Sequence, residues 1–201
     1  MAVKILTACS IEHKKYLKSC LRSTHNQNCI HYYEIDKRRE GKGVLMNRLL
    51  ESVNDNDIVG VLDADDMAAP NWIERIGLMK TFDLVYGDTM NIKANDDGQR
   101  YVSRDFDKEL FRKINFIPYS GTLIKGWLAK SVEYPNLVHA ADWLYWHRLL
   151  QHSDSFHYAP GIVSIRRTWT SHRKCNIPVY RKIRRLYRDY KVKQLINEIR
   201  T

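Results

Sequence analysis

The chain has 201 residues, 44% of them hydrophobic and 28% charged, which is enough for one well-buried domain and too little for two. Its net charge of +10 is unevenly placed, because residues 1–165 carry 21 basic and 21 acidic side chains whereas residues 166–201 carry 12 and 2. No apolar run approaches the roughly 18–20 residues of a membrane-spanning helix, and MAVKILTACS lacks signal-peptide features, so we expect a cytoplasmic protein, with any membrane contact peripheral.

The N-terminal part alternates short apolar runs with helical patterns. VKILTACS predicts a first strand, and residues 13–27 predict a helix because their apolar side chains recur at helical spacing. CIHYYEID predicts a second strand that ends at Asp36, VLMNRLLESV predicts a second helix, and DIVGVLDADD predicts a third strand. This alternation indicates βαβ units and an α/β fold with a mixed, mostly parallel sheet flanked by helices.

The pattern changes beyond residue 70. NWIERIGLM predicts a helix, and FDLVYGDTMNI and QRYVSRDF predict strands around the turn ANDDG. GTLIKGWLAKSV begins as a strand and becomes helical, ADWLYWHRLLQHS predicts a helix, and FHYAPGIVSIRR contains β-rich stretches. A long helical pattern follows Pro178, so we expect one domain over residues 1–175 and a basic amphipathic helix over 176–201.

The stretch IVGVLDADDMAAPNW, residues 58–72, ends a strand-like run in the carboxylates Asp63, Asp65 and Asp66. Ligands of α/β sheets bind beyond the carboxyl ends of strands, and clustered carboxylates repel one another unless a cation or hydrogen-bond donors neutralise them. Mg²⁺ and Mn²⁺ prefer such oxygen ligands together with substrate phosphates. The stretch therefore predicts a divalent cation bridging the protein and a diphosphate, unless Asp65 or Asp66 only caps the next helix.

VGVLDADDMAAPNWIERI resembles the strand, L-D-x-D-D and helix segment of family 2 glycosyltransferases, which have the GT-A fold. HKKYLKSCLRSTHNQ, EGKGVLMNRLLESV, NFIPYSGTLIKGWLAKSV, ADWLYWHRLL and VSIRRTWTSHRK resemble further segments in the expected order, so the resemblance covers roughly residues 1–175. The chain departs from the family where TACS ends the first strand, where EIDKRRE ends the second, and where Ala141 replaces the usual Glu before the catalytic aspartate.

The resemblance implies an inverting transfer of a sugar from a nucleoside-diphosphate sugar, a UDP-sugar above all, to an acceptor hydroxyl. Asp142 would be the general base, with a helix N-cap as the alternative. Mn²⁺ or Mg²⁺ would be held by Asp63, Asp65 and His172, although His172 also fits a surface histidine. The residues implied in binding the nucleotide-sugar are Thr7, Ala8, Asp36, Asn47, Asp63, Ala64 and Arg167.

The basic segment 178–200 decides which acceptor is expected. Lys and Arg surround its tyrosines, and Val179, Ile183, Leu186 and Tyr190 form one apolar face. The helix could dock on its own domain, bind DNA through phosphates, or lie on an anionic membrane surface. The acceptor is accordingly a glycan, a lipid-linked molecule, or a hydroxylated DNA base extruded from its duplex.

Two other functions stay open at this point. A nucleic-acid-binding protein on a glycosyltransferase-like scaffold could have lost catalysis, which the altered second strand and Ala141 favour. A nucleotidyltransferase also uses carboxylate-bound metal, but it usually carries a glycine-rich phosphate loop near the first strand, and the sequence has none there. Retention of Asp63, Asp65 and Asp142 together favours the glycosyltransferase.

Overall fold

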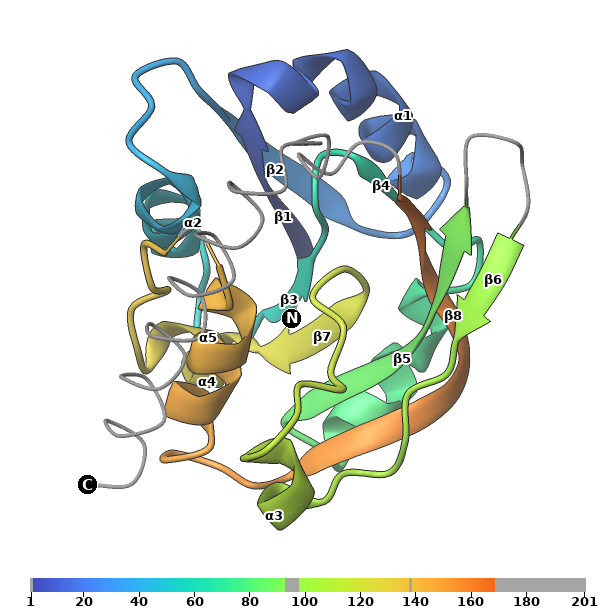
Figure 1. Ribbon diagram of the computed structural model, residues 1–201. Coiled ribbons are helices and arrows are strands. Elements are labelled where there is room, and N and C mark those ends of the chain that lie inside the picture. The colour runs from blue at the N-terminus through green and yellow to red at the C-terminus, as the bar shows by residue number, and fades with distance from the viewer. Residues whose placement is uncertain (1, 93–97, 138, 169–201) are drawn as a thin grey trace, which may run out of the picture.

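The computed structural model describes residues 2–92, 98–137 and 139–168, which fold around one mixed sheet of eight strands (Figure 1). The strands are β1 (Val3–Ser10), β2 (Ile30–Asp36), β3 (Ile58–Val61), β4 (Asp66–Ala68), β5 (Leu84–Ile92), β6 (Gly98–Tyr101), β7 (Thr122–Lys125) and β8 (Phe156–Arg167). The helices are η1 (Ile11–His13), α1 (Lys14–Thr24), α2 (Lys42–Glu51), η2 (Ile73–Lys80), α3 (Lys108–Phe111), α4 (Gly126–Lys130) and α5 (Ala141–Leu149).

The mixed α/β architecture expected from the sequence is confirmed. The strand order is β2-β1-β3-β7-β5-β8-β4, with β6 paired to β5. β1 runs parallel to β2 and β3, and β8 runs parallel to β5, whereas β7, β4 and β6 pair antiparallel with their neighbours. The two longest strand pairings, β1–β2 and β5–β8, are parallel, and the antiparallel pairings are short, so the sheet is mixed and mostly parallel as expected.

The elements that the sequence did not reveal are the short ones. β4 and α3 have three and four residues, too few for a periodic pattern. The NWIERIGLM helix forms, but as the 3₁₀ helix η2. None of the described helices is long and apolar enough to span a membrane. His172 and the expected C-terminal helix lie outside the described residues, so both stay predictions.

The two faces of the sheet carry separate hydrophobic clusters. On one face, Leu6 and Val59 pack with residues of α2, α4 and α5, including Trp146. On the other face, Ile5 and Ile58 pack with residues of α1 and η2. Successive strand residues point to opposite faces, so the burial of residues 3–7 in β1 and of all of β3 shows that these strands are covered on both sides.

Gly60 in β3 is needed because Trp72 occupies the space beside it. The Trp72 indole is fully buried, and its Nε1 donates a hydrogen bond of 2.8 Å to the carbonyl oxygen of Gly121. A Cβ added at Gly60 would lie 2.7 Å from the Trp72 ring and 2.6 Å from Ile5. Trp72 thereby connects β3 to the chain that enters β7, which is where the polar residues described below gather.

Replacing Gly60 with alanine should lower the free energy of unfolding by about 1–3 kcal/mol, because the new methyl group overpacks the core against Trp72. Gly77→Ala is the matched control, since a Cβ there meets no atom within 4 Å, and its effect should stay within about 1 kcal/mol. Urea denaturation of both variants measures the difference. Equal stabilities would contradict the packing described here.

Candidate functional site

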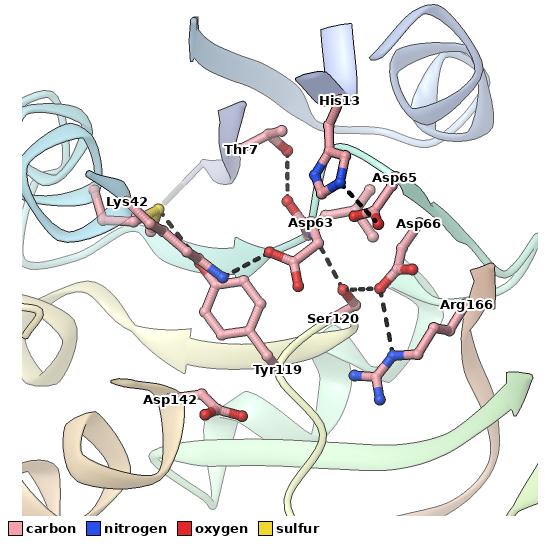
Figure 2. A network of polar contacts seen from close by, with 12 residues as sticks. Thr7, His13, Lys42, Asp63, Asp65, Asp66, Tyr119, Ser120, Asp142 and Arg166 are labelled. Atoms are coloured by element: carbon pink, nitrogen blue, oxygen red, sulfur yellow. Dashed lines mark hydrogen bonds and ion pairs between the residues drawn. The ribbon is translucent and has the colours of Figure 1, made fainter. Parts of the chain in front are cut away.

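The chain beyond β3 is held by the hydroxyl of Ser120, which is fully buried. Its Oγ accepts a hydrogen bond of 3.1 Å from the Asp63 backbone N–H and donates one of 2.6 Å to Oδ2 of Asp66 (Figure 2). Asp66 therefore turns inward, with its side chain 3% exposed, while those of Asp63 and Asp65 stay 30% and 16% exposed. Neither Asp65 nor Asp66 caps a helix, because Asp66 begins β4.

Lys42 lies at the first position of α2 and points toward Asp63. Its Nζ is 2.6 Å from Oδ1 of Asp63 and 3.4 Å from the centre of the Tyr119 ring. Burial, the largest single effect, lowers the pKa of Lys42, but Asp63, Tyr134 and Asp142 together outweigh it and hold the pKa of this ammonium above its usual range, with Asp63 contributing most. Lys42 is therefore a fixed positive charge at the end of β3.

Asp142 lies in the first turn of α5, but it is not the N-cap residue. Ala140 holds that position with a left-handed backbone at φ 56°. The Asp142 carboxylate accepts a hydrogen bond of 3.2 Å from Nδ2 of Asn115. Tyr119 lies between Lys42 and Asp142 in Figure 2, and the carboxylates of Asp63 and Asp142 both raise the pKa of its hydroxyl, after burial as the main cause. The structure thus brings Asp63 and Asp142 to one site.

Thr7 and Ala8 lie on β1, beside the same strand ends. The Thr7 hydroxyl is fully buried, donates a hydrogen bond of 2.8 Å to the carbonyl oxygen of Leu62, and forms another of 2.8 Å with Nε2 of His31. Ala8 is partly buried. Thr7 therefore fixes the start of the turn that carries Asp63, and its hydroxyl points into the protein.

Asp36 and Asn47 bind neighbouring backbone. Asp36 accepts hydrogen bonds of 2.9 Å from the N–H groups of Glu40 and Gly41. Partial burial would raise the pKa of Asp36, but these backbone donors lower it. The Asn47 amide accepts from the Tyr134 N–H at 2.7 Å and donates to the Tyr134 carbonyl oxygen at 3.2 Å. Both side chains hold the segments that surround Lys42.

Ala64 is buried, and Arg167 holds the turn next to it. The Arg167 guanidinium donates hydrogen bonds of 2.7 Å to the carbonyl oxygen of Asp65 and 2.9 Å to Oγ of Ser19. Arg167 therefore connects the end of β8 to α1 across the carboxylate turn. Arg167 thus lies beside Asp65, whereas Figure 2 shows Lys42 and Asp142 on the Asp63 side of the site.

The described residues do not fit a divalent cation shared by Asp63 and Asp65. Within residues 2–92, 98–137 and 139–168, no three His, Cys, Asp or Glu side chains are grouped so that they could hold a metal. Oδ1 of Asp63 is bonded to Lys42, whose ammonium would repel a second cation. Nε2 of His13 lies 3.9 Å from Oδ2 of Asp65, and the expected ligand His172 lies outside the described residues.

Lys42, Tyr119 and Ser120 were not singled out from the sequence. A lysine between Gly41 and Gly43 at a predicted helix start was a visible signal, since glycines permit close approach of backbone. Ser120 and Tyr119 gave no comparable signal, because their partners lie more than 50 residues away in the sequence.

No protein-family model matches this chain, and no curated protein matches it. Among solved structures, S. aureus TarS residues 1–349 in complex with UDP-GlcNAc matches with a TM-score of 0.63 and 11% identity, over 83% of this chain and 58% of that one. A second structure of TarS 1–349 gives a TM-score of 0.62, 11% identity, and coverage of 83% and 60%. The chain thus spans less than two thirds of the TarS structures it matches.

This likeness confirms the fold class. The described residues form a GT-A-like α/β fold, a curled mixed sheet flanked by helices, as the sequence resemblance implied. At 11% identity the likeness concerns the fold and not membership of family 2.

Asp66 should make stability depend on pH. Burial raises the pKa of this carboxyl to about 7, and the Asp63 charge adds to the effect while Arg166 and Ser120 oppose it. Between about pH 4 and 7 the folded protein keeps a proton that the unfolded chain has lost, so the free energy of unfolding falls as pH rises. Asp66→Asn cannot ionise and should gain on the order of 2 kcal/mol relative to wild type between pH 5 and 8. Urea denaturation of wild type and Asp66→Asn at pH 5 and pH 8 measures this difference. Free energies of unfolding that change equally with pH in the two proteins would contradict it.

Proposed function

We propose that this protein is an inverting glycosyltransferase that moves a sugar from a nucleoside-diphosphate sugar, with a UDP-sugar favoured, to an acceptor hydroxyl. The observation that carries the proposal is the arrangement of Asp142 and the Lys42–Asp63 ion pair around Tyr119 at the end of β3. The fold adds support, because its TarS neighbour was solved with UDP-GlcNAc bound.

Asp142 would act as the general base. It is half-buried, it belongs to a helix packed in the core, and Asn115 orients its carboxylate by a hydrogen bond. A carboxylate held in this way can take the proton from an acceptor hydroxyl as the oxygen attacks the anomeric carbon. Attack from the face opposite the leaving diphosphate inverts the configuration at that carbon.

The nucleotide would lie over the ends of β1, β2 and β3. Asp36 ends β2 and Asp63 follows β3, so the two positions expected to contact the nucleotide lie at one edge of the sheet. No metal is part of this proposal, because Asp63 is bonded to Lys42 and the expected ligand His172 lies outside the described residues. The acceptor stays a glycan, a lipid or a nucleic acid, because segment 178–200 lies outside them too.

Asp142→Asn should lower the turnover number by about 10²- to 10⁴-fold, because the amide cannot accept the proton of the acceptor hydroxyl. UDP affinity should stay within about twofold of wild type. The measurement is release of UDP from a panel of UDP-sugars in the presence of candidate acceptors, together with calorimetric titration of UDP. Asp154→Asn, at an exposed carboxylate beyond α5, is the control and should retain activity.

Full activity in Asp142→Asn would remove this residue as the base. Binding of UDP by wild type without any UDP release across the panel would favour the non-catalytic binding protein instead.

A further inference from the structure

We propose that Lys42 is the cation that binds the donor diphosphate, so that nucleotide binding at this site requires no divalent cation. The inference rests on the nucleotide-sugar function proposed above. It starts from the finding that Asp63, expected to bind a metal, is bonded to a lysine ammonium at 2.6 Å.

Lys42 is held in place by the backbone around it. Gly41 has φ +98°, and a Cβ added at Gly43 would lie 2.4 Å from Cα of Asn136. The Asn136 side chain accepts a hydrogen bond of 3.2 Å from the Gly43 N–H and donates one of 2.9 Å to the carbonyl oxygen of Glu40. The start of α2 is therefore clamped against the chain before α5, which fixes where the Lys42 side chain begins.

The far end of Lys42 is held as well. Its Nζ lies over the Tyr119 ring at 3.4 Å from the ring centre, and the Tyr134 ring centre is 5.8 Å away. A cation over an aromatic face is attracted by the ring. The ammonium has three donor hydrogens, and Asp63 is its hydrogen-bond partner among the described residues. Donors therefore remain for phosphate oxygens beside Asp63.

The charges around this position explain why a diphosphate needs Lys42. Asp63, Asp65 and Asp142 would repel an anion at the end of β3. The two nearby arginines have other partners, since Arg166 faces Asp66 and Arg167 binds the Asp65 backbone and α1. Within the part of the chain that the structure describes, the Lys42 ammonium is thus the cation bonded to Asp63. A charge-assisted hydrogen bond from it to phosphate is among the stronger polar contacts in proteins.

The experiment is calorimetric titration of UDP, UMP and uridine, each in EDTA and in Mn²⁺, against the full-length chain. The variants are Lys42→Met, which removes the charge and keeps an unbranched apolar side chain, and Lys42→Arg, which restores the charge. Lys125→Met is the matched control, because its ion pair with Asp83 at 2.7 Å is similarly exposed and β7 places it at the opposite end of β3. Thermal melts check that each variant is folded.

Lys42→Met also leaves Asp63 without its cation, which alone could repel UDP. The double variant Lys42→Met with Asp63→Asn removes that charge. It is compared with Asp63→Asn alone, because Asp63 is itself expected to contact the nucleotide, and it also serves if Lys42→Met does not fold.

Wild type should bind UDP with similar affinity in EDTA and in Mn²⁺. Lys42→Met should bind UDP about tenfold more weakly than wild type in EDTA, and the double variant about tenfold more weakly than Asp63→Asn alone. Uridine affinity should be equal within each pair, while Lys42→Arg and Lys125→Met stay near wild type. UDP binding by wild type only with Mn²⁺, or equal UDP affinity of the double variant and Asp63→Asn in EDTA, would overturn the inference and leave the proposed function intact. No binding of any nucleotide under either condition would overturn both.

Discussion

The buried hydroxyl of Ser120 is the contact on which the arrangement of the site depends. It accepts from the Asp63 backbone and donates to the Asp66 carboxylate, so the chain beyond β3 must turn back within four residues. The three carboxylates that follow β3 thereby fall into two groups. One carboxylate becomes part of the interior, where burial raises its pKa, and two remain partly exposed. The charge cluster therefore consists of one buried structural carboxylate, Asp66, and two partly exposed ones, Asp63 and Asp65, and not of three equivalent ligands.

The position of Ser120 is in turn a product of core packing. Its neighbour Gly121 donates a backbone hydrogen bond to the carbonyl oxygen of Val61, accepts one from the Trp72 indole, and adopts φ +91° with no room for a Cβ beside Val163. These contacts join β3, β7 and β8. Because Trp72 needs the space left by Gly60, the same packing that closes the sheet core also places the hydroxyl that organises the acidic turn.

The sequence reveals the parts of this structure that depend on local repetition. β1, α1, β2, α2 and β3 follow from alternating apolar periods, and Asp36, Asp63 and Asp142 were expected at element ends, where the structure has them. β4 and α3 are too short to show a period. The inward direction of the Asp66 carboxylate could not be predicted, because it is set by Ser120, distant in the sequence. Arg167, expected to bind the nucleotide-sugar, donates hydrogen bonds to the Asp65 carbonyl oxygen and to Ser19, contacts that only the folded chain creates.

A lysine at the place where a metal was expected changes how such a site would respond to its surroundings. Carboxylates on both sides of Lys42 keep its pKa high against the opposing effect of burial, so its charge persists throughout the neutral pH range. A metal carries two charges but exchanges with solvent, whereas an ammonium attached to α2 and held over Tyr119 carries one charge and is already oriented. Because the ammonium is already oriented, the protein needs little rearrangement around the leaving group as that group becomes negative. Binding of the diphosphate would then be set by Lys42, and the rate of attack by Asp142, so the two functions belong to different helices on either side of one aromatic ring.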